Sequence, residues 1–367
     1  MLPYWLLIAV PVIAAFLAFG RARQLLQAKT TQTTSTQMGD YWPMIMFAVV
    51  MALMVGLRHE VGGDWLNYLP SVEASLGMNL EEGLRSGGDP AYGLLTWLSA
   101  HLGLGIYGVN LFCAAVFTVG LVVFARNSPQ PWLVLCVAVP YLVIVVAMGY
   151  TRQGVAIGLA MVGLVALQNG RLWTFILWLF GAALFHKSAL ILVPLALFAG
   201  RKSWIALLGV LAAGVLMVAF LLLDYVDNLV AGYITDQYAS SGAHIRVAMN
   251  ALPATIFIVF RKRFGLTDAQ QAFWTWMSLG ALAFIPLLAI SPSSTAVDRL
   301  ALYWIPLQLF VWPRLPQAMG ISLGTQRQWL TVVLCYSVAV QFVWLFFADN
   351  SWAWIPYRFY PIEWLWS

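Results

Sequence analysis

Long apolar segments recur along this 367-residue chain, and the polar stretches between them sort by the sign of their charge. Most segments run for about 15 to 21 residues, close to the roughly 20 residues with which a helix crosses a membrane. Charged residues make up 9% of the chain and hydrophobic residues 62%, so there are too few charges to cover a water-facing surface. The sequence therefore predicts an all-α polytopic membrane protein.

We expect about twelve transmembrane helices in a single integral membrane domain over residues 1–367. The expected spans are Leu2–Phe19, 41–57, 105–125, 131–149, 152–168, 172–186, 188–200, 203–223, 246–260, 270–290, 298–313 and 329–347. Basic residues follow the first span and do not precede it, which indicates a retained helix and not a secretory signal. We assign residues 91–104 to a helix that lies in the membrane interface or dips into it. A span there would move every later turn to the opposite side of the membrane, and the charges would no longer sort by side.

The orientation follows from the turns between the spans. Turns on one side hold twelve basic residues and two acids, whereas the other side holds seven basic residues and twelve acids. This is the positive-inside bias expected when all spans follow one orientation, with the basic turns in the cytoplasm. Two stretches on the outer, periplasmic side, 58–104 and 224–245, are long enough to carry short amphipathic helices on the membrane face.

Several classes of chemistry lack their usual sequence patterns. The three cysteines lie inside apolar segments and the four histidines are scattered, so neither type shows metal-ligand spacing. There is no P-loop, no GxGxxG after a strand and no D-x-D pair. We therefore expect no metal and no cofactor, and no pattern indicates a nucleic-acid partner.

Cations stand at the outward ends of helices that are far apart in sequence. They are Arg58, Arg152, Lys187, Arg299 and Arg358. If they converge in the bundle they form a site for a diphosphate, because Arg binds phosphate oxygens with a planar fork and stays charged when partly desolvated. The alternative is that each cation reaches individually to lipid phosphates, which is common at the ends of spans.

Local context favours the diphosphate site at two positions. Arg58 leads into a Gly-Gly turn with an acid six residues on, and Arg152 stands beside Gln153 in an otherwise apolar stretch. Thr151 is a candidate helix cap that leaves free N–H groups and the positive end of the helix dipole beside Arg152. Lys187 and Arg246 fit the lipid-facing alternative better.

Two carboxylates follow Arg58 closely, and one histidine ends a later span. Asp64 is the first candidate for a general base and Glu60 the second, since partial desolvation and nearby Arg act on a carboxyl pKa in opposite directions. An ordinary helix N-cap is the alternative role for Asp64. His186 is a candidate for phosphate binding or protonation of a leaving group, or else a structural residue at a helix end.

Candidates for sugar binding lie beside these groups. Trp65 and Tyr68 follow Asp64, Gln153 follows Arg152, and Tyr357 precedes Arg358. Aromatic rings stack on sugars, but aromatic residues at a membrane interface are commonly lipid anchors. This is the alternative role for Trp65, Tyr68 and Tyr357.

Five motifs together resemble the EpsG-like family of Wzy-type bacterial exopolysaccharide polymerases. They begin at Arg58 (RHEVGGDWLNY), Gly149 (GYTRQGVA), Ala183 (ALFHKSAL), Asp298 (DRLALY) and Trp354 (WIPYR). The resemblance implies a fold similar to C-type glycosyltransferases. It also implies polymerisation of undecaprenyl-diphosphate-linked oligosaccharide at the outer face of the bacterial inner membrane. Membrane lipid, and a flippase and chain-length regulator of the same pathway, are the partners it suggests. Lys187 after His186 departs from the small or polar residue more usual there.

Two other functions remain open from the residues. A lipid-linked oligosaccharide flippase or other transporter also needs cations for a diphosphate, yet it should line a cavity at the membrane midplane with polar residues. The polar content within the spans is low. A ligase that moves the glycan to another acceptor would use the same donor and the same cations.

Overall fold

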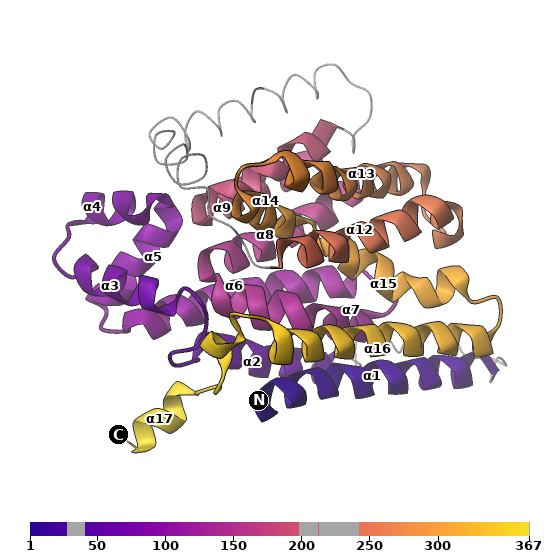
Figure 1. Ribbon diagram of the computed structural model, residues 1–367, viewed down its shortest axis with the longest axis horizontal. Coiled ribbons are helices and arrows are strands. Elements are labelled where there is room, and N and C mark those ends of the chain that lie inside the picture. Colours follow the sequence, from indigo (N-terminus) through magenta and orange to yellow (C-terminus); the bar gives the residue numbers. More distant parts are fainter. Residues whose placement is uncertain (28–40, 198–211, 213–241, 367) are drawn as a thin grey trace.

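The structure, a computed structural model, describes residues 1–27, 41–197, 212 and 242–366. Figure 1 shows these residues as a bundle of helices. The α-helices are α1 (Leu2–Gln27), α2 (Trp42–Gly56), α3 (Trp65–Ser75), α4 (Leu80–Arg85), α5 (Pro90–His101), α6 (Gly105–Arg126), α7 (Pro131–Ala138), α8 (Thr151–Gln168), α9 (Leu172–Phe185), α12 (Ala243–Phe260), α13 (Asp268–Ile290), α14 (Ser294–Ala301), α15 (Ile305–Met319), α16 (Leu323–Phe347) and α17 (Tyr360–Trp366). A π-helix, η2 (Val139–Ala147), continues α7. The 3₁₀ segments are η1 (Ser86–Gly88), η3 (Lys187–Leu197), η5 (Arg261–Phe264), η6 (Leu302–Trp304) and η7 (Ser351–Trp354).

Six helices of the described chain are long and apolar enough to cross a membrane: α1, α6, α8, α12 with η5, α13 and α16. Shorter apolar helices are α2, α7 with η2, α9 and η3. The all-α, membrane-embedded fold is thereby confirmed. Each expected span contains a helix except 203–223, which lies outside the described residues apart from residue 212. The total of twelve spans stays a prediction.

Glycines bring α6 and α8 into close contact near the middle of the bundle. A Cβ atom on Gly120 would lie 2.1 Å from the carbonyl oxygen of Gly158, and one on Gly158 would lie 2.6 Å from Cα of Phe117. Small residues at such positions let two helix backbones approach, which is a common source of packing energy within membranes. Because residues 110 and 151 also meet, the two helices run parallel and begin at the same end of the bundle.

The π-helix η2 replaces regular α-helix in the expected span 131–149, and all nine of its residues are buried. Pro140 has no backbone N–H, so it cannot donate an intrahelical hydrogen bond, and the series of backbone hydrogen bonds is interrupted there. The indole Nε1 of Trp354 donates to the carbonyl oxygen of Ile144 at 2.7 Å. A side chain from the far end of the chain thus supplies a donor to the widened helix.

The expected outer stretch 58–104 forms α3, α4 and α5, which gather at one end of the bundle (Figure 1). A capping box between Asn79 and Glu82 starts α4. The stretch expected to lie in the membrane interface becomes α5, twelve residues that contact α3, α4, α6 and α9. Of the second expected outer stretch, 224–245, only the residues from Gly242 onward are described, and they start α12.

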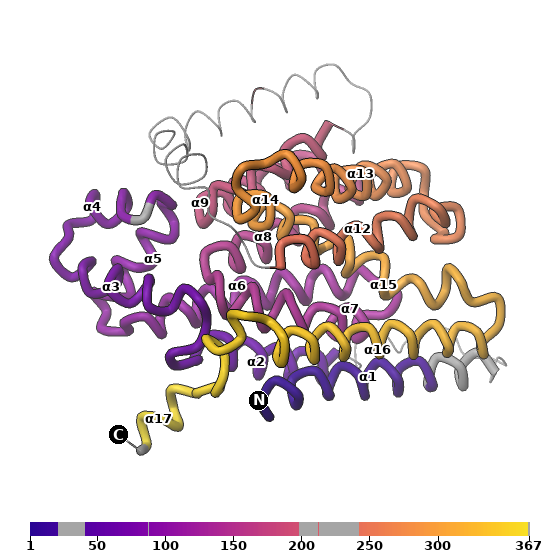
Figure 2. Tube along the Cα trace, viewed as in Figure 1, coloured from indigo at the N-terminus to yellow at the C-terminus, as the bar shows by residue number. Residues whose placement is uncertain are grey.

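The two ends of the chain pack against each other. Helices α1 and α16 lie side by side, as Figure 2 also shows, and the amide of Gln341 donates to the Tyr4 carbonyl oxygen at 2.9 Å. Tyr4 in turn donates its hydroxyl to the carbonyl oxygen of Trp354 at 2.7 Å. After η7 the chain forms an antiparallel bridge between Phe359 and Arg58. The C-terminal segment therefore supports the loop that precedes α3.

Candidate functional site

Helices α6, α8, α12 and α14 begin at the same end of the bundle, where polar side chains join them. Thr151 of α8 donates its hydroxyl to Asn110 Oδ1 of α6 at 3.3 Å, and Gln153 donates to the Arg299 carbonyl oxygen at 2.5 Å. We name the ionisable residues of this region the polar layer. It consists of Asp64, Tyr68, Asp89, Tyr150, Arg152, His186, Arg246, Asp298 and Arg299.

Arg152 and Asp89 form the part of the polar layer nearest α3 and α5. The guanidinium carbon of Arg152 lies 5.6 Å from the ring centre of Tyr68 and 5.5 Å from that of Tyr92. Its Nη1 lies 3.4 Å from Asp89 Oδ2. Two aromatic faces and a carboxylate hold this cation in place, and its side chain remains one-third exposed. Arg152 is therefore both positioned and accessible.

Asp89 is a buried carboxylate that the sequence analysis did not select. Besides Arg152, it accepts the backbone N–H of Lys187 at 3.3 Å, and its Oδ2 lies 3.5 Å from Nδ1 of His186. It occupies the N-cap position of α5 but makes no capping bond with its side chain. An Asp before Pro is typical of a helix start, so no sequence signal indicates that this residue joins α5 to α8 and to the α9–η3 junction.

His186 lies between two polar groups. Its Nδ1 faces Asp89, and its Nε2 is 3.1 Å from the hydroxyl oxygen of Ser188. Nδ1 is buried and makes no hydrogen bond to a described residue, so Asp89 lies beside the ring without a hydrogen bond to it. The structure thus brings His186 and Arg152, both predicted site residues, to the same carboxylate.

Asp64 follows a turn that only glycine allows. Gly62 has φ +109°, and a Cβ atom on it would lie 2.3 Å from the carbonyl oxygen of Met148. Asp64 stands at the N-cap position of α3, yet its side chain makes no capping bond. It accepts instead the hydroxyl of Tyr68 at 3.1 Å and is half-buried. The alternative role of Asp64 as a side-chain N-cap is therefore not observed.

Burial and the neighbouring Asp64 charge raise the pKa of Tyr68. The phenol consequently keeps its proton and continues to donate to Asp64 at physiological pH. The same causes, burial first and then the charge of Asp64, raise the pKa of Tyr150, while Arg246 and Arg299 oppose them. Tyr150 therefore lies close enough to Asp64 and to both arginines to interact with their charges.

Arg299 and Arg246 are the two arginines whose charges act on Tyr150. The guanidinium carbon of Arg299 is 5.6 Å from the Tyr150 ring centre, and the side chain is half-buried. Among the described residues no carboxylate lies within ion-pair distance of Arg299. Arg246, in contrast, binds Asp298 with two bonds, from Nε at 2.5 Å and from Nη2 at 2.7 Å. Of these two arginines, Arg299 is the better placed to meet an anionic ligand.

Arg58 is the most deeply buried of the predicted cations, with 1% of its surface exposed. Its guanidinium donates to the Val55 and Val61 carbonyl oxygens at 2.5 and 3.0 Å, to Thr151 Oγ1 at 2.7 Å and to Asn110 Oδ1 at 3.3 Å. Burial lowers the pKa of Arg58 to about 10. All three nitrogens contact protein acceptors, so this side chain ties the loop before α3 to α6 and α8.

Thr151 does not cap α8 as the sequence analysis expected. The N-cap is Tyr150, which makes no side-chain bond to the helix, and the hydroxyl of Thr151 contacts Arg58 and Asn110. The physical reason is the buried guanidinium of Arg58, which needs an acceptor at this position.

Arg358 and Glu60 form an ion pair on the exposed side of the C-terminal segment. Glu60 has φ +51°, a conformation that is rare outside glycine. This pair lies on the bridge between the C-terminal segment and the loop before α3. Within the described part of the chain, no hydrogen bond joins Glu60 or Arg358 to Asp64, Arg152 or Arg299.

The predicted sugar-binding residues contact protein groups. Trp65 is 5% exposed and packs against His59 and Tyr107, and Tyr68, also 5% exposed, packs against Tyr92. Gln153 is 3% exposed and binds the Arg299 carbonyl oxygen. The hydroxyl of Tyr357 donates to the Met54 carbonyl oxygen at 2.8 Å. These three rings and the amide already contact protein groups. A role in binding sugars stays a prediction, and this geometry does not favour it.

The fold and the polar layer define an all-helical, membrane-embedded protein with acidic and basic side chains gathered at one end of its bundle. The family model of the EpsG family matches residues 41–359. Because the match covers most of the chain, the protein belongs to the EpsG family, and the resemblance seen in five sequence motifs is confirmed. No curated protein and no solved structure matches the chain.

Proposed function

We propose that this protein is a membrane glycosyltransferase that joins undecaprenyl-diphosphate-linked oligosaccharide repeat units into exopolysaccharide, without a metal ion. Membership of the EpsG family supports a polysaccharide polymerase-type membrane protein. The observation that carries the proposal is the half-buried Asp64, bonded to Tyr68 within a layer that also holds Arg152 and Arg299. A base and two cations are the groups that such a transfer requires.

The proposal places the polar layer at the periplasmic face of the bacterial inner membrane, in a protein of about twelve spans arranged as in C-type glycosyltransferases. Its support is the charge sorting. Basic residues stand at the ends of α6 and α12 with η5, far from α3–α5, whereas acids dominate the end that holds the polar layer.

The reaction in this proposal is a displacement at the anomeric carbon of the donor glycan. An acceptor hydroxyl gives its proton to the Asp64 carboxylate while its oxygen bonds to that carbon. The bond from the carbon to the diphosphate oxygen breaks, and the electron pair leaves with the polyprenyl diphosphate. Arg299 and Arg152 neutralise the charge that develops on the leaving group. His186, beside Asp89, adds a further donor there when protonated.

Three predicted residues take different roles in this proposal. Arg58 supports the loop of Asp64 instead of binding diphosphate, because its nitrogens contact protein acceptors. Glu60 and Arg358 hold the C-terminal segment on the same loop. The proposed base is therefore Asp64, and the cations proposed to meet the diphosphate are Arg152 and Arg299. Lys187 is a further candidate, because its backbone N–H donates to Asp89, the partner of Arg152.

A reconstituted assay with purified protein and lipid-linked repeat units tests the proposal. The wild-type protein should give a ladder of longer glycans, and Asp64→Asn should slow its formation by about 10² to 10⁴ because the base is lost. Glu73→Gln is the matched control, since Glu73 is an exposed carboxylate on the same helix, α3. A ladder at the wild-type rate from Asp64→Asn would exclude Asp64 as the base.

The same assay separates the alternatives. Relocation of the lipid-linked unit across the bilayer without lengthening would identify a flippase, and one shifted product on a different acceptor would identify a ligase. Either result in place of a ladder contradicts the proposed polymerase.

A further inference from the structure

A groove of about 480 Å³ runs between α12 and α16. Both helices contact α15, and Tyr141 of the π-helix η2 also lines the groove. In Figure 1 the ribbon of α15 is seen between those of α12 and α16. The groove runs along α12 and α16, two of the helices that are long and apolar enough to cross a membrane.

The lining changes from polar to apolar along the helices. Gly242, Arg246, Asp349 and Asn350 form one end, where α12 begins and α16 has ended. From there the lining continues along both helices through Ile245, Met249, Phe347, Trp344, Val343, Val340, Ala339 and Tyr336. The lining residues of α16, from Phe347 back to Tyr336, span about 16 Å of helix, roughly half the hydrocarbon core of a bilayer. The groove is therefore long, apolar and polar only at one end.

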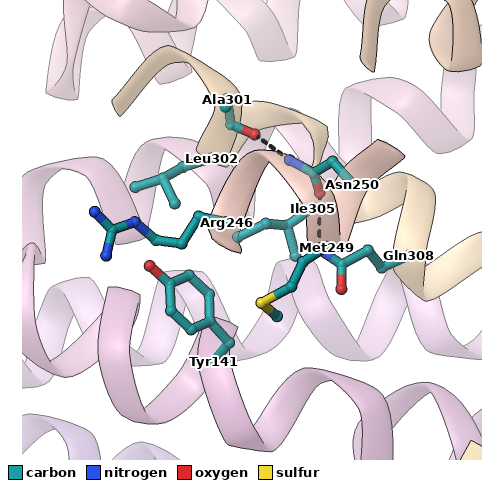
Figure 3. A pocket seen from close by; sticks show the side chains of 8 residues that line it. All are labelled: Tyr141, Arg246, Met249, Asn250, Ala301, Leu302, Ile305 and Gln308. Atoms are coloured by element: carbon teal, nitrogen blue, oxygen red, sulfur yellow. Dashed lines mark hydrogen bonds between the residues drawn. The ribbon is translucent and has the colours of Figure 1, made fainter. Parts of the chain in front are cut away.

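The polar end of the groove meets the polar layer. Arg246 lines the groove and binds Asp298 of α14, the residue before Arg299. Figure 3 draws a crevice next to the groove and shows the guanidinium of Arg246 next to the hydroxyl of Tyr141; both residues line the crevice and the groove. A headgroup at this end therefore lies beside the arginines of the proposed active site.

Hydrogen bonds fill the crevice that adjoins the groove at Tyr141, Arg246 and Met249. Asn250 donates to the Ala301 carbonyl oxygen at 2.8 Å and accepts the amide of Gln308 at 2.7 Å, as Figure 3 shows. These bonds join α12 to α14 and α15, and the crevice lined by these residues has no room for a water molecule. A ligand of the groove consequently lies along α12 and α16 and does not enter the core.

We propose that this groove holds the polyprenyl chain of the lipid-linked glycan, with the diphosphate at the polar layer. The inference rests on the proposed function and names the part of the substrate that this surface binds. Apolar walls favour a hydrocarbon chain over water or sugar. The apolar lining ends at Asp349 and at Arg246, which is paired with Asp298, and the residue after Asp298 is Arg299. A long-chain lipid in the groove therefore carries its diphosphate past this end to Arg299, the cation of the polar layer proposed to meet it.

Photo-crosslinking tests the groove without requiring polymerisation. A photoreactive phenylalanine analogue replaces Val343, which lines the groove, or Val119, an exposed valine of α6 outside it. With polyprenyl-diphosphate-linked repeat units, the adduct should form at position 343 and should be displaced by excess polyprenyl diphosphate, but not by an equal excess of phosphatidylglycerol. Equal adducts at both positions, or displacement by phosphatidylglycerol, would show bulk lipid only and overturn the proposal.

Steady-state kinetics supply a second test. Val343→Trp narrows the groove and should raise the KM for a long-chain donor at least tenfold, whereas a donor with a chain of two isoprene units should be unaffected. Val119→Trp should change neither KM. An unchanged KM for the long-chain donor in Val343→Trp would contradict the proposal. If the wild-type protein makes no ladder at all, the proposed function fails, and the crosslinking result still decides whether the groove binds the chain.

Discussion

At the scale of single residues, Asp89 is the carboxylate around which the neighbouring polar groups gather. Its Oδ2 lies 3.4 Å from Arg152 Nη1 and 3.5 Å from His186 Nδ1, and its Oδ1 accepts the backbone N–H of Lys187. These contacts join α5 to α8 and to the α9–η3 junction, so the loss of this one charge should affect all of them.

Replacing Asp89 by Asn should impair both stability and activity. The neutral amide loses the attraction to Arg152 and His186, and we expect a loss of about 1–3 kcal/mol of stability for this buried group together with a slower ladder. Thermal unfolding in detergent and the polymerisation assay measure the two effects. Glu81→Gln is the control, because Glu81 pairs with Arg85 on the exposed surface and should leave both readouts unchanged. A variant at Asp89 that matches this control would show that the carboxylate has no positioning role.

Arg58 and Arg299 should separate into a structural and a ligand-binding arginine. Arg58→Lys cannot reach four acceptors from two sides, so the unfolding temperature should fall by several degrees. Arg299→Ala should keep the unfolding temperature and raise the KM for the lipid-linked donor at least tenfold. Binding of the donor and thermal unfolding, measured on both variants, check this. The reverse pattern would return Arg58 to the diphosphate site.

The sequence indicates which residue types matter in this region but not which of them meet. Local context selects Asp64 and Arg152, and the structure places both at Tyr68. Local context does not select Asp89, because an Asp before Pro is typical of a helix start and the contacts of Asp89 come from residues 63 and 98 positions away. It also assigns Arg58 to a ligand, because the acceptors of a guanidinium cannot be read from the sequence.

At the scale of helices, apolar periodicity located the elements well and their geometry less well. The ranges expected for α6, α8, α9 and α13 differ from the observed helices by two residues or fewer at each end. The sequence could not show that residues 139–147 widen into a π-helix, because Pro140 indicates an interruption but not its form. The order of the spans already makes α6 and α8 parallel, but the sequence could not show that they lie in contact, since Gly120 and Gly158 are not distinguished from other glycines by their neighbours in sequence.

Gly158→Ala should loosen the contact between α6 and α8. The new methyl group would lie 2.6 Å from Cα of Phe117, which is backbone and cannot turn aside. We expect a loss of about 1–3 kcal/mol from overpacking. Gly181→Ala of α9 is the control, because the nearest atom to its new methyl group is a leucine Cδ1 at 4.0 Å. Unfolding measured in parallel should show Gly181→Ala unchanged or slightly more stable, and equal stability of the two variants would contradict the contact.

At the scale of the whole molecule, the charge pattern predicted a bundle with unlike ends, and the fold is consistent with it. One end carries α3–α5, the polar layer and most of the acids, and the other carries the ends of α6 and η5 with their basic residues. What the pattern could not predict is the closure of the chain, in which α1 lies along α16 and residues 353–359 pair with the loop before α3. Such contacts join residues about 300 positions apart, for which hydrophobic periodicity carries no signal.

Cysteine labelling should establish the orientation. In whole cells with a permeable outer membrane, a membrane-impermeant thiol reagent should label Glu73→Cys in α3, and should label Lys262→Cys in η5 only after the inner membrane is opened. Both positions are exposed in the structure. Labelling of position 262 alone in intact cells would invert the topology and move the polar layer to the cytoplasm.

The pairing of the C-terminal segment with the loop of Asp64 has a consequence for biosynthesis. Gly62 donates its N–H to the Ala353 carbonyl oxygen at 2.8 Å, and His59 donates to that of Arg358 at 3.0 Å. These acceptors are synthesised almost 300 residues after their donors. Nearly the entire polypeptide must therefore be synthesised before the loop of Asp64 acquires its native partners, and nascent chains interrupted earlier carry this loop without them.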